Sequence, residues 1–344
     1  MPYISGRVAA IAVCIAAIAS AQAQPQTAQD FLRKYLGFSE ADITALDKGQ
    51  LVTKLPKVSD QREVAAFAAV RVNALPEQLA VQFHDIVKWK KGDNVPEIGK
   101  FSSNPVLADL TGLTIEPEDI KDLKKCKPGN CDIKLSAVSM ERLVKGTNWA
   151  ADNYEGQAER LFKQMLVDYV GTYKIGGNRY LVQYADQRQT LKLPEEFSSL
   201  LKESTYVTDY APELANYIDK FPNASLPGSE DYIYWSKEKF GIQPVLSATH
   251  TTIYSRRHGN ASEVLIASKQ LYATHYFESS LAFTMMIPRE DGGSYLLYLN
   301  RSRTDTLRGF LSGITRMFIS GHVRDGAAKS LQLAKQRLEA GQFN

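Results

Sequence analysis

The last third of the chain contains five strand-like segments in succession, and this run limits the possible folds more than any other feature. The segments are rich in β-branched and aromatic residues, and Gly, Asn and Pro turn signals separate them. They are Asp231–Lys237, Val245–Ser255, Val264–Phe277, Ser279–Ile287 and Ser294–Arg301. Strands joined by short turns run antiparallel. The run therefore predicts an antiparallel sheet.

A helical period follows these strands and continues almost to the end of the chain. From Asp305 onward apolar residues recur at helical spacing, including the stretch Leu331–Leu338. Upstream, Arg62–Asn73 has the composition of a strand, and Pro76 begins a helical pattern that extends to Trp89. The order of strand, helix, antiparallel strands and long C-terminal helix resembles the helix-grip layout of the START and Bet v 1-like superfamily.

This resemblance rests on element order over Arg62–Trp89 and Asp231–Leu338. It implies an α+β fold in which a curved antiparallel sheet packs on a long C-terminal helix, with a ligand cavity between them. Residues 91–230 would then be a loop-rich and mostly helical insertion within a single domain, 24–344. Fold analogy bears on architecture more directly than on function.

Local signals predict further elements outside the strand-rich third. Ser39 and Asp42 have the spacing of a capping box within a helical stretch at 27–48. Gly176-Gly177 ends a long helical stretch that begins at about Ala137. Two shorter helices, each with Pro near its first turn, are expected at 194–202 and 212–221, and brief strands at 131–136 and 179–186.

The N-terminus has the pattern of a secretory signal. Arg7 precedes an apolar run from Val8 to Ser20, and Ala21-Gln22-Ala23 fits a small-x-small cleavage site. The run is too short to span a membrane as a helix, although an uncleaved anchor is the alternative. We therefore expect residues 1–23 to be a cleaved signal, with no transmembrane anchor in the mature chain and a periplasmic or secreted location.

Two cysteines remain after removal of the signal, and a turn signal lies between them. Cys126 and Cys131 flank Pro128-Gly129, which brings the two ends of the segment together. An oxidising compartment permits a disulfide, and we expect Cys126–Cys131 to close a tight local loop. Metal binding and a redox pair are the alternatives, but two cysteines without a nearby histidine pair do not complete a zinc site.

Charge and motifs exclude several classes of function. The 41 basic and 38 acidic residues give a formal charge of +3, so we expect no nucleic-acid partner. The chain lacks the nucleophile elbow, P-loop, zinc-protease and dinucleotide-binding motifs. Its five histidines show no metal-ligand spacing. The sequence therefore implies no metal site and no organic cofactor, and it assigns no catalytic residue.

Polar residues within the predicted strand Val264–Phe277 are the main candidates for ligand binding. Lys269 and His275 lie on an otherwise apolar face if the strand alternates regularly, where they need partners. Tyr272 and Tyr276 fall on the opposite, hydroxyl-rich face, and His250 lies on the preceding strand. These residues are candidates for holding the polar end of a ligand, or for acid–base chemistry. The alternative is an exposed face or a carboxylate partner for each group.

Arg301 and Arg303 lie where the last strand leads into the C-terminal helix. Two guanidinium groups near a helix N-terminus suit a phosphate or carboxylate ligand. Structural salt bridges are the alternative. The leading hypothesis is an exported protein that binds a hydrophobic or amphipathic, lipid-like molecule in a cavity between sheet and helix. The alternatives are an exported hydrolase that uses His250 or His275 as a base, and a cell-envelope protein-interaction module.

Overall fold

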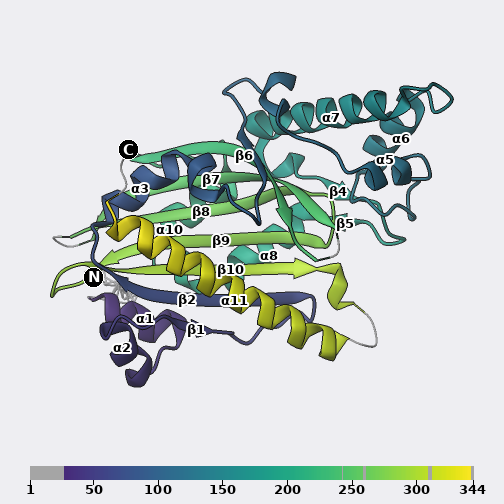
Figure 1. Cartoon of the computed structure of the whole chain (residues 1–344). Coiled ribbons are helices and arrows are strands. Elements are labelled where there is room, and N and C mark those ends of the chain that lie inside the picture. The colour runs from purple at the N-terminus through teal and green to yellow at the C-terminus, as the bar shows by residue number, and fades with distance from the viewer. Residues whose placement is uncertain (1–26, 242, 259–260, 309–311, 342–344) are drawn as a thin grey trace, which may run out of the picture.

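The computed structural model describes residues 27–241, 243–258, 261–308 and 312–341, so the expected signal segment lies outside the described residues. A single large antiparallel sheet forms the middle of the molecule, with helices on both of its faces (Figure 1). The fold is α+β, as predicted, and the sheet is not closed into a barrel. A large antiparallel sheet with a C-terminal helix is compatible with a helix-grip layout.

The eight strands of the sheet are arranged in the order β1-β2-β10-β9-β8-β7-β6-β3, and every neighbouring pair is antiparallel. The five predicted C-terminal strands are present and form a meander from β6 to β10. The bounds of the sheet strands are β1 Val52–Lys54, β2 Glu63–Val72, β3 Glu97–Lys100, β6 Ser229–Lys239, β7 Pro244–His258, β8 Ala261–Ala273, β9 Phe277–Pro288 and β10 Ser294–Thr304.

Eleven α-helices are present in the described residues, and sequence signals mark several of their ends. Ser39 and Asp42 form the predicted capping box of α2, and Gly177, with φ 64°, follows the last residue of α7. The bounds are α1 Ala28–Leu36, α2 Glu40–Asp47, α3 Pro76–His84, α4 Ile86–Lys90, α5 Pro117–Leu123, α6 Ala137–Gly146, α7 Tyr154–Gly176, α8 Leu193–Glu203, α9 Thr205–Thr208, α10 Pro212–Lys220 and α11 Ser312–Glu339.

The C-terminal helix lies directly on one face of the sheet. Apolar residues of α11 that recur at helical spacing pack with the side chains of β2 and β10 that point to this face, and α3 covers the neighbouring strands β7 to β9. The buried residues of α11 here are Ala327, Leu331, Ala334 and Leu338. Side chains therefore fill the space between the described part of α11 and the sheet.

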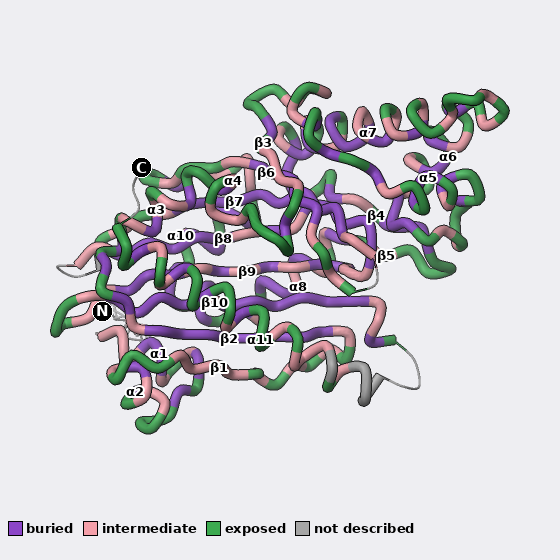
Figure 2. The backbone as a smooth tube through the Cα atoms, in the orientation of Figure 1, coloured by how far each residue is buried: buried purple, intermediate pink, exposed green. Residues whose placement is uncertain are grey.

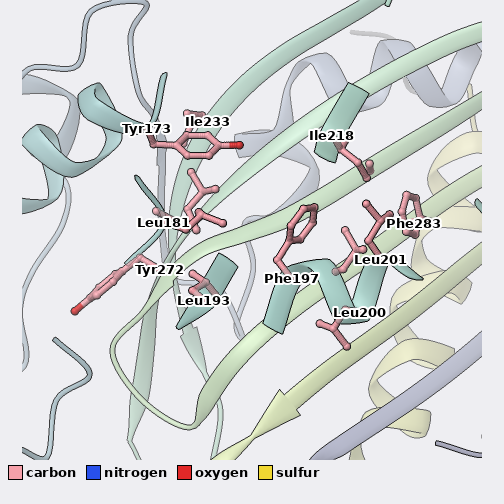
Figure 3. Packing of buried hydrophobic residues seen from close by; sticks show 14 of the residues in the cluster. Tyr173, Leu181, Leu193, Phe197, Leu200, Leu201, Ile218, Ile233, Tyr272 and Phe283 are labelled. Atoms are coloured by element: carbon pink, nitrogen blue, oxygen red, sulfur yellow. The ribbon is translucent and has the colours of Figure 1, made fainter. Parts of the chain in front are cut away.

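The opposite face of the sheet carries the larger hydrophobic core. The alternate residues of the same strands, such as Phe67, Leu265 and Phe283, pack against α1 and α8 to α10. Figure 3 shows Phe197, Leu200 and Leu201 of α8 in this core. Covering both faces leaves the central strands almost entirely buried, as Figure 2 shows.

The insertion has two roles in the architecture. Its later helices, α8 to α10, cover the sheet, whereas α5 to α7 lie at one end of it (Figure 1). The predicted helix at 137–174 is two helices, because residues 147–153 leave helical geometry between α6 and α7. The expected strand at 131–136 is irregular, and the one at 179–186 is mostly replaced by the 3₁₀ turn η2, Gly177–Tyr180, and the two-residue strand β4, Gln183–Tyr184. β4 pairs with β5, Leu191–Lys192, in a small separate sheet.

Replacing Leu331 by Ala should weaken the attachment of α11 to the sheet. The Leu331 side chain is 3% exposed, and truncation of a buried leucine costs about 2–5 kcal/mol of unfolding free energy. Leu333→Ala is the matched control, since Leu333 lies on the same helix but is 46% exposed and should change stability by less than about 0.5 kcal/mol. Urea unfolding measures both variants. Equal effects would contradict the packing described.

Candidate functional site

The side chain of Lys269 on β8 is buried on the core face that α8 to α10 cover. It is 1% exposed, and its Nζ donates to Asn178 Oδ1 at 2.6 Å and to the Ile218 carbonyl at 3.4 Å. The ammonium group also lies over the rings of Tyr173 and Phe197. No carboxylate lies within ion-pair distance among the described residues. Burial lowers the pKa of Lys269 to about 7, with partial opposition from Asp219 and Asp231.

Next to Lys269, a hydrogen-bonded chain connects a carboxylate, an imidazole and a phenol. His250 pairs with Lys269 across β7 and β8. Its Nε2 lies 2.8 Å from Asp231 Oδ1, and its Nδ1 lies 2.8 Å from the Tyr173 hydroxyl. Asp231 also accepts hydrogen bonds from Thr252 and Tyr217. The chain therefore spans β6, β7 and α7.

The protonation states in this chain follow from the environment. Burial alone would raise the pKa of Asp231, but hydrogen bonds from His250, Thr252 and Tyr217 lower it overall. Burial lowers the pKa of His250 and raises that of Tyr173. An ionised Asp231 can only accept, so Nε2 of neutral His250 carries the proton and Nδ1 accepts from the phenol. Both ring nitrogens are thus occupied.

A tight turn holds Asn178 against Lys269. Gly177 has φ 64°, and a Cβ at this position would lie 1.7 Å from the Phe221 carbonyl oxygen, so only glycine fits here. The Phe221 ring packs on both Tyr173 and His250 and covers the hydrogen-bonded chain. The two residues after Asn178 in the same turn, Arg179 and Tyr180, line a cleft.

The cleft lies between α6, α7 and the segment from η2 to β5, and it has a volume of about 520 Å³. Protein sites for small ligands are typically 300–1,000 Å³ and mainly apolar. The walls of this cleft are also mostly apolar, and two of its lining residues, Val138 and Tyr180, are exposed. The lining residues are Leu135, Ser136, Ala137, Val138, Ser139, Met165, Tyr169, Arg179, Tyr180, Leu181, Val182, Gln183, Ala185, Thr190 and Tyr272.

Tyr272 is the one sequence-predicted candidate that lines this cleft. A register shift between β7 and β8 places Gln270 and Tyr272 opposite consecutive residues of β7. Tyr272 therefore joins the core cluster that Lys269 and Leu271 face, so the expected strict alternation of faces is wrong here. Figure 3 shows its hydroxyl pointing away from Leu181 and Leu193. That hydroxyl is buried and has no hydrogen-bond partner among the described residues.

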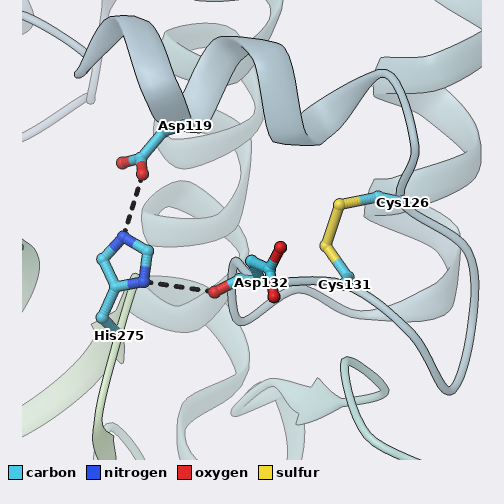
Figure 4. The surroundings of a disulfide bond; sticks show 5 residues. All are labelled: Asp119, Cys126, Cys131, Asp132 and His275. Atoms are coloured by element: carbon cyan, nitrogen blue, oxygen red, sulfur yellow. Dashed lines mark hydrogen bonds and ion pairs between the residues drawn. A yellow bond between two sulfur atoms is a disulfide. The ribbon is translucent and has the colours of Figure 1, made fainter.

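His275 and Tyr276 lie in the turn between β8 and β9, where the sequence predicted a continuous strand. His275 Nε2 lies 3.0 Å from Asp119 Oδ1, and its Nδ1 lies 3.2 Å from the Asp132 carbonyl oxygen. Figure 4 shows this contact beside the predicted disulfide, Cys126–Cys131, which is present. His275 thus fixes the disulfide loop to the end of the sheet and does not meet His250.

Tyr276 makes hydrogen bonds that hold the same turn in place. Its φ of 58° lies in the left-handed region, and its hydroxyl accepts the Gln243 N–H at 3.0 Å. The backbone carbonyl of Tyr276 accepts the Asp305 N–H. These contacts hold the turn against the segment before β7 and the segment after β10.

Arg301 and Arg303 form salt bridges with neighbouring carboxylates, which is the alternative to ligand binding given by the sequence. Arg301 pairs with Glu63, and Arg303 pairs with Glu196 at 2.7 Å and Glu203 at 3.2 Å. These pairs fix α8 to the ends of β2 and β10. The arginines and the carboxylates beside them compensate one another's charge, so this cluster has little remaining attraction for an anion.

Several cleft residues were not foreseen from the sequence. Tyr169, Leu181, Arg179 and the start of α6 come from separate segments, and no spacing pattern connects them. One signal was available, because the Gly176-Gly177 helix stop favours a turn at Arg179 rather than the expected strand. The pairing of Asp231 with Thr252 across the β6–β7 hairpin also places Asp231 near His250.

No helix in the described ranges is long and apolar enough to cross a membrane. The same residues contain no group of three or more His, Cys, Asp or Glu side chains placed to hold a metal ion. No family model, curated protein or solved structure matches the chain. Function therefore has to be argued from the site itself.

Lys269→Met should reduce the pH dependence of stability in weakly alkaline solution. Between about pH 7 and 10.5 the unfolded lysine keeps its proton while the native one loses it, so stability of the natural protein rises with pH. One proton contributes at most about 1.4 kcal/mol per pH unit. Urea unfolding at pH 7, 8 and 9 should show this rise for the natural protein and for the exposed control Lys145→Met. If the stability of Lys269→Met rose with pH as steeply as that of the natural protein, the lowered pKa of Lys269 would be contradicted.

Tyr272→Phe should leave stability unchanged or raise it, because the removed hydroxyl has no partner. Tyr184→Phe is the matched control, since Tyr184 is also buried and its hydroxyl accepts the Ala273 N–H at 3.0 Å. That variant leaves a buried N–H unpaired and should cost about 1–3 kcal/mol. Thermal and urea unfolding test the contrast. A loss in Tyr272→Phe as large as that in Tyr184→Phe would reveal a structural partner for the hydroxyl.

Proposed function

We propose that this protein is exported and binds a hydrophobic or amphipathic small molecule in the cleft beside α6 and α7. The observation that carries the proposal is the cleft itself, which has a volume of about 520 Å³ and a mainly apolar lining that includes Tyr272. Buried polar groups are normally satisfied, because leaving one unpaired costs about 1–3 kcal/mol. The Tyr272 hydroxyl is buried without a partner among the described residues, so a ligand that displaces the side chains covering it would satisfy this group.

The location of this cleft differs from the expected cavity between sheet and C-terminal helix. The described part of α11 packs closely on the sheet, whereas α6 and α7 lie at its end and are only partly covered. The helix-grip resemblance supports ligand binding only as an analogy, since it rests on element order. The cleft residues support ligand binding independently of that analogy.

Export is supported by two sequence features. Residues 1–23 have the composition of a cleaved signal, and the Cys126–Cys131 disulfide fits an oxidising compartment. We therefore propose a periplasmic or secreted location for the ligand-binding chain.

A hydrolase with a histidine base has less support. Both ring nitrogens of His250 and of His275 already have protein partners, and both residues are at most 5% exposed. A general base must reach the proton it removes. The envelope-interaction alternative has no specific observation in its favour, and it is an outcome of the test below.

Val138→Trp should block the cleft and abolish binding of a neutral apolar probe. Val138 is 76% exposed and lines the cleft, so an indole has room to cover the opening without disturbing the core. Fluorescence titration with N-phenyl-1-naphthylamine measures binding, and native mass spectrometry of protein from the exported fraction detects co-purifying lipid. The matched control is Val81→Trp, since Val81 is also exposed but lies on α3, away from the cleft.

Saturable binding that Val138→Trp reduces at least tenfold and Val81→Trp leaves unchanged would support the proposal. Absence of both probe binding and co-purifying lipid in the natural protein would overturn it. Stoichiometric recovery of a protein partner that Val138→Trp does not affect would favour the interaction module instead.

A further inference from the structure

The cleft has one charged lining residue among those that the structure describes, and it is a cation. Arg179 lies in the η2 turn and is exposed. Its guanidinium packs 5.0 Å from the Tyr180 ring centre, and no carboxylate of the described residues lies within ion-pair distance of it. Most other arginines of the described chain have such a partner, including Arg142 with Asp168 on neighbouring helices. Arg179 thus gives an apolar cleft a positive edge.

The start of α6 contributes positive potential to the same cleft. Ser136, Ala137, Val138 and Ser139 all line it. The Ser136 hydroxyl caps the helix by accepting the Ser139 N–H at 3.0 Å. The N–H groups of Ala137 and Val138, in the first turn of α6, have no acceptor within the helix. The N-terminal end of a helix carries partial positive charge that favours anions.

A helix N-terminus by itself would not define a site, but the cleft also contains Tyr272. Tyr272 is 3% exposed and lines the cleft, and its hydroxyl is buried and has no hydrogen-bond partner among the described residues. No Asp or Glu is present among the described lining residues. The charge of the described cleft lining is therefore positive, and apolar lining residues lie beside it.

We propose that the ligand is a single-chain anionic amphiphile, with its apolar chain in the cleft and its carboxylate or phosphate head at Arg179 and the first turn of α6. This inference rests on the proposed function and names its ligand class. The guanidinium forms paired hydrogen bonds to either kind of head group. Met165, Tyr169 and Leu181 supply the apolar surface for the chain.

Displacement of bound N-phenyl-1-naphthylamine tests the inference with four ligands of equal chain length: dodecanoate, dodecyl phosphate, dodecan-1-ol and dodecylamine. At pH 8, and below the concentrations at which they form micelles, the natural protein should bind at least one anion about tenfold or more tightly than the alcohol. The amine should bind weakest. Comparison of dodecanoate with dodecyl phosphate identifies which head group is preferred.

Arg179→Gln should reduce the affinity for the anions about tenfold relative to that for the alcohol, so that the preference for the anions is lost. The matched control is Arg142→Gln, since Arg142 lies on α6 outside the cleft lining and should retain the preference. Circular dichroism confirms that both variants are folded.

The outcomes separate this inference from the proposed function. Equal binding of anions and alcohol, with no effect of Arg179→Gln, overturns the inference while probe binding upholds the proposed function. Equal losses in Arg179→Gln and Arg142→Gln show general attraction by surface charge and also overturn it. Failure of the natural protein to bind the probe overturns the proposed function itself.

Discussion

Burial of both faces of the sheet determines where the described part of this protein forms its cleft beside α6 and α7. The strands alternate between a face covered by α11 and α3 and a face covered by α1 and α8 to α10, and each covered face is filled by interdigitating side chains. The cleft lies instead where the helices extend past the ends of the strands. This is the position of α6 and α7 at the end of the sheet (Figure 1).

The buried cation Lys269 connects this sheet to the cleft. An ammonium group without a carboxylate partner in an apolar core is costly, and it is tolerated here because Asn178, the Ile218 carbonyl and two aromatic rings surround it. Asn178 belongs to the same short turn as Arg179 and Tyr180. The contact that satisfies Lys269 therefore also fixes the backbone that carries the positive edge of the cleft.

Sequence reasoning succeeded where a local pattern decides the structure. The meander of β6 to β10, the capping box at Ser39 and the disulfide all follow from short-range signals. It failed between Tyr272 and Phe277, where no Gly or Pro interrupts a strand-like composition. The turn there depends on long-range contacts instead: His275 with Asp119, and Tyr276 with Gln243. The cleft could not be foreseen because its walls come from four separated segments.

Arg301 and Arg303 differ from Arg179 in how far neighbouring carboxylates compensate their charge. The position of Arg301 and Arg303 before a helix predicts a phosphate or carboxylate ligand, but Glu63, Glu196 and Glu203 already neutralise them. Their carboxylate partners would have to be displaced, which leaves buried charges uncompensated. Arg179 keeps its charge exposed beside an apolar surface and next to a helix N-terminus. A ligand with an apolar chain and an anionic head satisfies all three features at once, whereas a purely apolar ligand would leave the positive edge unused.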